Sequence, residues 1–387
     1  MELIYLDNAA TTRTDERVVE AMLPYFTRYY GNASTIYALG EESRKAVTRA
    51  RDIIAAGIGA KPEEIYFTAG GSESDNWALK ATAEAYKEKG KHIITSKIEH
   101  HAILHTCEWL ERQGFEVTYL DVDENGRINP ADVEAAIRPD TILISIMFAN
   151  NEIGTIEPIA EIGAIAKAHG VLFHTDAVQA FGQEPIQVDE MNIDMLSSSG
   201  HKLNGPKGIG FLYIRKGVKI RSFVHGGAQE RKRRAGTENV PAIAGLGEAA
   251  EEIYENLDEK RAHLYGLKQR FIDGIEKLEG THVNGKTGED SAPHIVSVSF
   301  EGIRSEVLLH SLEDRGIYVS SGSACSSNNH AGKQKGSKTL RNIHLKENLL
   351  DSTLRFSFSV HTTEEEIDYA LEVLGELLPV LKKYTRH

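Results

Sequence analysis

The sequence predicts an α/β protein with a large, mostly parallel sheet domain and a smaller α+β domain. Short runs of apolar and β-branched residues alternate with longer helical patterns through the first two thirds of the 387 residues. Several of these runs are too apolar to leave one face in water, which is typical of parallel strands covered on both sides. The alternation ends near Gly247, where a different pattern begins.

The first part contains six predicted strands separated by helical stretches. The strands cover residues 65–68, 92–95, 117–120, 141–148, 171–173 and 209–214. The clearest helices between them cover residues 74–89, 130–137 and 159–169. Gly90 and Gly170 stand where helix C-terminal ends are expected. This order of elements predicts a sheet with helices on both faces.

The second part begins with a long polar helix, residues 248–278, which is expected to connect the two domains. Beyond it the sequence predicts a small α+β unit. Its strands cover residues 295–300, 317–319 and 353–358, and its helices cover 305–314 and 363–383. Segment 320–338 is rich in Ser, Gly, Asn and Lys, and it is predicted to be a mobile surface loop.

Composition excludes several classes of function. The chain has 44 Lys plus Arg against 57 Asp plus Glu, a formal net charge of -13 that opposes non-specific binding to nucleic acid. A small-molecule or protein partner is therefore expected. The two cysteines form no disulfide framework, and the sequence shows neither a basic leader nor an apolar run of about 18 residues. We expect a soluble cytoplasmic protein.

Residues 68–76 form the first candidate site, where a predicted strand passes into a helix. The small residues let the backbone approach a ligand, and free N–H groups at a helix start attract an anion such as phosphate. An ordinary helix cap by Ser72 or Ser74 explains the segment equally well. The segment matches neither a Walker loop nor G-x-G-x-x-G, so nucleotide binding has no support.

Asp176 and Lys202 are the next candidates. Asp176 follows an apolar run, and ligands of open α/β sheets bind beyond the carboxyl ends of strands. Lys202 lies in a Gly-rich turn, where a desolvated amine can act as a nucleophile. Each residue alone is more often a surface residue. Together with an anion-binding helix start, they meet the needs of pyridoxal phosphate for phosphate donors, a pyridinium partner and an amine for its aldehyde.

A metal site is one interpretation of a group of histidines. His101 and His105 lie four residues apart on one helix face, with Glu99 nearby. A His ring that stacks on a cofactor or caps the helix explains the group as well, and the sequence identifies no third ligand. We therefore predict no metal.

Cys325 and Arg355 complete the candidates. Cys325 lies among lysines in segment 320–338, where an exposed thiol can be ionised and reactive, whereas Cys107 lies in an apolar helical pattern typical of a core. The fork of Arg355 matches the α-carboxylate of an amino acid. A surface arginine on the polar face of a strand is an equally good interpretation of Arg355.

With these residues in view, the chain resembles the NifS/IscS-like cysteine desulfurases, pyridoxal phosphate enzymes of the class V aminotransferase family, and within them the long-loop group I. The resemblance covers nearly the whole chain. The motifs that carry it are Tyr5 to Thr12, Glu99 to Ala102, Asn150 to Thr155, His174 to Gln179, Ser199 to Lys202, Gly226 to Glu230 with Arg234 to Thr237, and Ser321 to Cys325. It implies the type I pyridoxal-phosphate-dependent transferase fold, with a seven-stranded type of sheet.

The resemblance implies a role for each matching residue. The expected catalytic residues are Lys202 for the Schiff base, His100 as the ring-stacking acid/base group, and Cys325 as the sulfur acceptor. Asp176 is expected to pair with the pyridinium nitrogen and Gln179 to donate to the phenolic oxygen. The expected phosphate ligands are Gly71, Ser72, Ser199, His201 and, from a second subunit, Thr237. Asn151, also placed in the cofactor site, and Arg355 are expected to hold the substrate carboxylate.

The resemblance also implies domains and partners. Residues 16–255 are expected to form the large cofactor-binding domain. Residues 1–15 with 256–387 are expected to form the small domain that carries the cysteine loop, 320–338. The expected partners are L-cysteine, a second copy of the chain, and a sulfur-acceptor protein of the iron–sulfur scaffold or tRNA thiolase type. Neither a membrane nor a specific nucleic acid is expected.

Some positions depart from the family pattern. Ala33 and Tyr37 stand where Pro and His are typical, and Gly71-Ser72 replaces Ala-Thr. Ser72 keeps a hydroxyl for phosphate. Ser359 replaces a usual Gly, and residues 328–345 do not follow the common sequence after the cysteine. These departures put the choice of acceptor protein in question.

The expected reaction converts L-cysteine to L-alanine. Lys202 removes the Cα proton, and Cys325 takes the sulfur as a persulfide before an acceptor receives it. One alternative is a selenocysteine lyase, which shares the cofactor residues and can act without the thiol. The other is a non-catalytic scaffold that binds sulfur-transfer partners.

Overall fold

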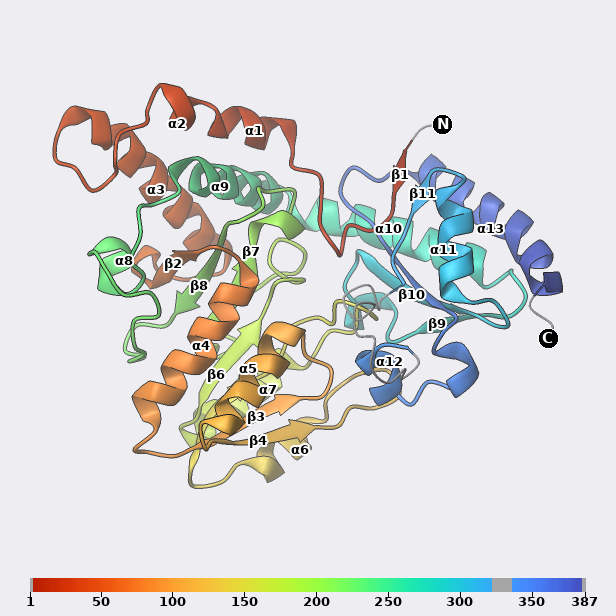
Figure 1. The fold of residues 1–387 in the computed structure, drawn as a ribbon, viewed down its shortest axis with the longest axis horizontal. Coiled ribbons are helices and arrows are strands. Elements are labelled where there is room, and N and C mark those ends of the chain that lie inside the picture. The colour runs from red at the N-terminus through yellow and green to blue at the C-terminus, as the bar shows by residue number, and fades with distance from the viewer. Residues whose placement is uncertain (1–2, 322–335, 385–387) are drawn as a thin grey trace.

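A seven-stranded sheet forms the centre of the computed structural model, which describes residues 3–321 and 336–384 (Figure 1). The strand order is β2-β8-β7-β6-β5-β3-β4, and only β8 runs antiparallel to its neighbours. The strands are β2 (Ile65–Thr68), β3 (His92–Ser96), β4 (Glu116–Leu120), β5 (Thr141–Ser145), β6 (Leu172–Asp176), β7 (Met195–Ser199) and β8 (Gly210–Ile214). The predicted large, mostly parallel sheet is confirmed.

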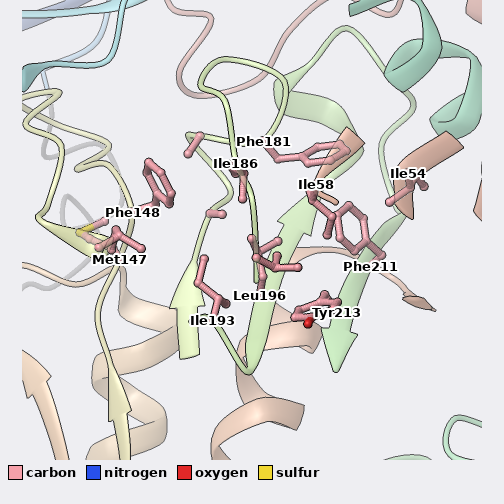
Figure 2. Packing of buried hydrophobic residues seen from close by; sticks show 14 of the residues in the cluster. Ile54, Ile58, Met147, Phe148, Phe181, Ile186, Ile193, Leu196, Phe211 and Tyr213 are labelled. Atoms are coloured by element: carbon pink, nitrogen blue, oxygen red, sulfur yellow. The ribbon is translucent and has the colours of Figure 1, made fainter. Parts of the chain in front are cut away.

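Helices cover both faces of this sheet, because side chains alternate between the faces along each strand. Tyr66 and Leu212 pack into a core with α4 and α5, whereas Phe67 and Phe211 pack into a second core with α3, α7 and α9. Figure 2 shows part of the second core, including Ile54 of α3. These helices are α3 (Ala38–Gly57), α4 (Gly71–Tyr86), α5 (His101–Arg112), α7 (Ile159–His169) and α9 (Val240–Glu255).

Both ends of the chain build a second, smaller unit with its own core, in which Leu6 packs with Phe271, Phe356 and Leu374 (Figure 1). β10 pairs antiparallel with β9 and β12, and β1 pairs parallel with β11. The strands are β1 (Ile4–Tyr5), β9 (Thr281–Asn284), β10 (Ile295–Phe300), β11 (Ile317–Tyr318) and β12 (Thr353–Ser357), and the helices are α10 (Leu257–Ile275), α11 (Ser305–Glu313) and α13 (Glu364–Tyr384). The boundaries expected for the two domains stay a prediction.

Five shorter α-helices complete the described part of the chain. They are α1 (Glu16–Met22), α2 (Pro24–Thr27), α6 (Pro130–Ala136), α8 (Gln229–Lys232) and α12 (Lys338–Asn342). Leu340 of α12 and Ile343 beyond it pack into the core of the large sheet, although they follow β11 in the chain. No helix within residues 3–321 and 336–384 is long and apolar enough to cross a membrane.

The prediction of one long helix over residues 248–278 is wrong. The structure has α9 and α10, separated at Asn256, whose φ of -139° and ψ of 40° are not helical. α9 begins earlier than expected, at Val240, where the Asn239 side chain caps it. Gly247 lies inside α9, at the place where α9 packs closely against α3. A Cβ built on Gly247 would stand 2.6 Å from the Cβ of Ala50.

Other elements also differ from the prediction. The helix expected over 74–89 is α4, which begins at Gly71 and ends at Tyr86, and strands β7 and β9 were not predicted. The strand expected over 141–148 ends at Ser145. In the segment expected to be a loop over 320–338, Ser320 forms an antiparallel bridge with Arg355, and Lys338 begins α12. Residues 322–335 lie outside the described residues.

Candidate active site

The carboxyl ends of three parallel strands bring the predicted cofactor residues to one edge of the sheet. Asp176 ends β6, Lys202 follows β7 in a short 3-10 turn, and Gly71 begins α4 after β2. A Cβ built on Gly71 would lie 2.6 Å from Val178 Cγ2 and 3.8 Å from Ser199 Cβ. The helix start therefore packs directly against the connection that follows β6 and against the last residue of β7.

The start of α4 has the backbone of an anion site. Gly70 has a φ of 145°, which favours glycine, and no side chain caps the helix. The Ser74 hydroxyl lies 3.0 Å from the Phe211 carbonyl oxygen, and Ser72 is exposed. The alternative of an ordinary cap by Ser72 or Ser74 is therefore wrong. The 16-residue helix directs its positive end at this edge.

The other expected phosphate ligands lie at different distances from this helix start. Ser199 is buried, and its Oγ lies 3.5 Å from the position of a Cβ on Gly70. The His201 Nδ1 lies 3.1 Å from the Thr11 hydroxyl, and burial with nearby lysines lowers the pKa of His201 to about 4. The ring is therefore neutral at pH 7. Thr237 is exposed beyond α8, and its role in a second subunit stays a prediction.

Asp176 is a buried carboxyl that favours a cationic ligand. Its Oδ1 accepts a hydrogen bond from Val178 N at 3.0 Å. Burial raises the pKa of Asp176, while His100 and Lys202 act in the opposite direction. Burial and Asp176 together raise the pKa of Asp75, whose Oδ1 accepts no hydrogen bond from the described residues and lies 3.8 Å from Nε2 of His174. A protonated pyridine nitrogen beside these carboxyls would restore their ionisation, so the residues fit the expected cofactor.

The N-terminal segment holds the residues expected to contact the reacting end of the cofactor. Lys202 Nζ donates to the Ala9 carbonyl and, at 2.8 Å, to the Ala10 carbonyl. Gln179 Nε2 donates to the same Ala9 carbonyl at 3.0 Å. The Gln179 Oε1 lies 3.0 Å from Nε2 of His294. Ala9, Ala10 and His294 were not predicted as contacts of these residues, because none of the three follows a predicted strand of the large sheet.

The histidine group does not assemble with Glu99. His100 caps α5, with Nδ1 accepting from Ala102 N at 3.2 Å. His101 and His105 are exposed with ring centroids 5.1 Å apart, whereas Glu99 is buried. Within the described parts of the chain, no group of three or more His, Cys, Asp or Glu side chains is arranged to hold a metal ion.

Arg355 is buried, so its interpretation as a surface residue is wrong. Its Nη1 donates to the Asn151 carbonyl and its Nη2 to Asp7 Oδ1, both at 2.7 Å. Nε is buried without a partner among the described residues. Asp7 therefore fixes the guanidinium close to the N-terminal segment that contacts Lys202. This role of Asp7 was not predicted from the sequence. The Asn151 contact uses its backbone carbonyl.

Both boundaries of segment 322–335 lie near Arg355. Ser320 and Arg355 exchange backbone hydrogen bonds of 2.7 and 3.2 Å. On the other side, the Thr339 hydroxyl of α12 donates to Glu152, which adjoins Asn151, at 3.2 Å. Cys325 itself lies outside the described residues. Cys107 is fully buried, as predicted, and burial raises the pKa of its thiol.

Comparisons with known proteins show the family of the chain. The family model described as Aminotransferase class-V matches residues 4–370. The chain belongs to this family. The type I pyridoxal phosphate fold of the class V aminotransferases is the predicted fold, and the observed sheet confirms it.

Curated relatives from the class V family carry a more specific name. The chain is 54% identical over 379 residues to "Cysteine desulfurase IscS" of Methanosarcina thermophila, covering 98% of this chain and 93% of that protein. It is 51% identical over 380 residues to "Putative cysteine desulfurase IscS 1" of Bacillus subtilis strain 168, covering 98% and 99%. The resemblance stated from the motifs is confirmed.

Solved structures share the fold. A "NIFS-LIKE PROTEIN" has a TM-score of 0.91 and 39% identity, with 98% of this chain and 100% of that chain covered. A structure described as "SspA in complex with cysteine" has a TM-score of 0.81 and 39% identity, with 93% and 100% covered.

Proposed function

We propose that this class V family member is a pyridoxal-phosphate-dependent cysteine desulfurase. The observation that carries the proposal is the convergence of Asp176, Lys202 and the uncapped start of α4 at one sheet edge, with buried Arg355 nearby. The names of relatives near 50% identity support the same activity.

The described residues offer a partner for each part of the cofactor. The start of α4 with Gly71 and Ser72, together with Ser199 and His201, would hold the phosphate. Asp176 would hold the pyridine nitrogen, Gln179 the phenolic oxygen, Lys202 the aldehyde carbon, and His100 the face of the ring. When bound, the cofactor supplies an electron sink that permits ionisation of the Cα–H bond of an amino acid.

Lys202, as a neutral amine, would remove the Cα proton of L-cysteine, which requires its side chain to leave the Ala9 and Ala10 carbonyls. Arg355 would bind the substrate carboxylate bidentately, with Asn151 beside it. Cys325 as thiolate would then attack the substrate sulfur. The new S–S bond forms as the Cβ–S bond breaks, Cβ receives a proton, and the products are L-alanine and a Cys325 persulfide.

The proposal includes partners. We propose a homodimer, supported by the exposed position of Thr237 and by an N-terminal apolar patch. This patch consists of the exposed side chains of Val19, Leu23, Phe26, Tyr30, Ile36, Tyr37 and Leu39. Ile36 is 100% exposed in the single chain, an arrangement that favours an apolar partner such as a second copy. A sulfur-acceptor protein would receive the persulfide sulfur, and the low cysteine content supports a cytoplasmic location.

Replacement of the proposed lysine tests the function. Purified wild type should bind pyridoxal phosphate with visible absorption and release alanine from L-cysteine. Lys202→Ala should lose at least about 1,000-fold in turnover, because the proton carrier and the covalent attachment are removed together. Lys219→Ala, an exposed lysine in the connection after β8, is the control and should retain activity. Full turnover by Lys202→Ala would contradict the proposal.

A further inference from the structure

We propose that His294 is a positioning residue that holds the Gln179 amide in the orientation needed to donate a hydrogen bond to the cofactor's phenolic oxygen. The inference rests on the proposed function, because that function places Gln179 against this oxygen. His294 itself would not touch the cofactor. It would act from the small unit of the fold on a residue of the large sheet.

The contacts of Gln179 determine which way its amide faces. Its Nε2 lies 3.0 Å from the Ala9 carbonyl, and its Oε1 lies 3.0 Å from His294 Nε2. In the reversed orientation the amide oxygen would face the Ala9 oxygen, and two acceptors would meet. The Ala9 carbonyl therefore requires an N–H, and the opposite oxygen requires a donor from His294. These two contacts fix the plane of the amide, and therefore also the direction of the second N–H of Gln179.

His294 can donate a hydrogen bond from only one of its ring nitrogens. It is 3% exposed, and burial lowers its pKa to about 3, with Lys268, Lys202 and Arg355 acting in the same direction. The neutral ring has one N–H, and the Gln179 oxygen requires this N–H to be on Nε2. Nδ1 is buried without a partner among the described residues. A proton on Nδ1 would leave a buried donor unsatisfied, so the contacts favour the Nε2–H form.

The backbone around His294 holds the ring in place. Phe358 N, one residue beyond β12, donates to the His294 carbonyl at 2.9 Å. Ala292 and Ile295 on either side form a small buried cluster with Ala9 and Ala149. Because the same cluster includes Ala9, the frame that fixes His294 also fixes the carbonyl that orients Gln179. A residue held this way sets geometry for its neighbour without joining the chemistry.

The test compares cofactor-loaded wild type with His294→Gln and His294→Leu. The Gln side chain keeps an N–H at a similar distance from Gln179 Oε1, whereas the Leu side chain fills much of the space but has no hydrogen-bond donor. His282→Leu, an exposed histidine on β9, is the matched control. The measurement is the pH midpoint at which the visible absorption of the bound cofactor changes. A donor stabilises the phenolic anion, so its loss should raise the midpoint.

We expect His294→Leu to raise the midpoint by about 0.5 to 1 pH unit and to weaken cofactor binding by about 3- to 10-fold, the effect of one lost hydrogen bond. His294→Gln and His282→Leu should match wild type within about 0.2 unit on the same scale. Melting of the cofactor-free proteins checks folding. If the Leu variant does not fold, His294→Asn replaces it with the same expected shift, because the shorter amide does not reach Gln179.

An unchanged midpoint in a folded His294→Leu would overturn the inference. Equal shifts in the Gln and Leu variants would also overturn it, because they would assign His294 a packing role. Both results would be seen in proteins whose wild type binds the cofactor and releases alanine. A wild type that binds no cofactor would instead overturn the proposed function, so the two failures are distinguishable.

Discussion

Arg355 illustrates how single residues acquire their role from the fold. In the sequence it is one polar residue in an alternating strand, yet the structure buries it and fixes two of its nitrogens on Asp7 and the Asn151 carbonyl. A buried guanidinium needs such partners to offset its desolvation. The planar fork, held rigidly, is suited to a carboxylate.

We predict that Arg355→Lys raises KM for L-cysteine by about 10- to 100-fold, because a lysine provides neither the fork nor the two fixed contacts. Steady-state alanine release measures it. Arg304→Lys, an exposed arginine before α11, should change KM less than about 2-fold, as expected for surface changes. An unchanged KM for Arg355→Lys would remove Arg355 from substrate binding.

Residues beside predicted strand ends could be found from the sequence, and their distant partners could not. Asp176 follows an apolar run, so the topology of an α/β sheet predicts its place at the sheet edge. Lys202 was a candidate because of its Gly-rich turn, and the strand before it, β7, was not predicted. Asp7 meets Arg355 across 348 positions, and His294 meets Gln179 across 115. Such contacts depend on how the small unit packs against the large sheet, which no local pattern records.

Among the elements, the connection between β3 and α5 carries a buried acid. Glu99 Oε1 accepts from the Ser96 hydroxyl at 2.7 Å and from Met147 N at 3.0 Å, and Oε2 has no partner among the described residues. Burial raises the pKa of Glu99 from 4.5 to about 8. The folded protein therefore keeps a proton on Glu99 at pH 7 that the unfolded chain releases.

A raised pKa stabilises the fold at low pH, and this contribution is lost as pH rises from about 4.5 towards 8. We predict that the free energy of unfolding of wild type falls relative to Glu99→Gln by about 2 kcal/mol between about pH 6 and pH 8. Denaturant melts measure it, with exposed Glu84→Gln as the control. Comparison with Glu99→Gln removes the opposite slope of Lys268, whose pKa burial lowers to about 7. A constant difference across this range would show that Glu99 is ionised.

Only one of the two predicted glycine stops marks a helix end, because α4 ends at Tyr86, four residues before Gly90. Gly170 ends α7 in the left-handed conformation that the sequence predicts. Asn256 interrupts a continuous helical pattern without Gly or Pro, so the sequence predicts one helix where the structure has two. Packing of α9 against α3 and α1 and of α10 in the small unit decides that boundary.

For the whole molecule, the N-terminal apolar patch and Thr237 favour a dimer. We predict that the double variant Phe26→Glu with Ile36→Glu is a monomer, because the apolar contact area between the subunits is lost. Cofactor binding should also weaken, because Thr237 of the second subunit is no longer present at the site. Sedimentation measures the mass. Val380→Glu, at an exposed position of α13, should remain dimeric. A wild type that sediments as a monomer would contradict the dimer.

The mass of the cysteine-containing peptides after reaction with L-cysteine shows which of the two cysteines receives the sulfur. We predict one added sulfur atom on the Cys325 peptide and none on the Cys107 peptide, whose thiol is buried with a raised pKa. Cys325→Ala should keep the absorption of the bound cofactor and lose alanine release. Added sulfur on Cys107 alone, or alanine release by Cys325→Ala at the wild-type rate, would contradict the account.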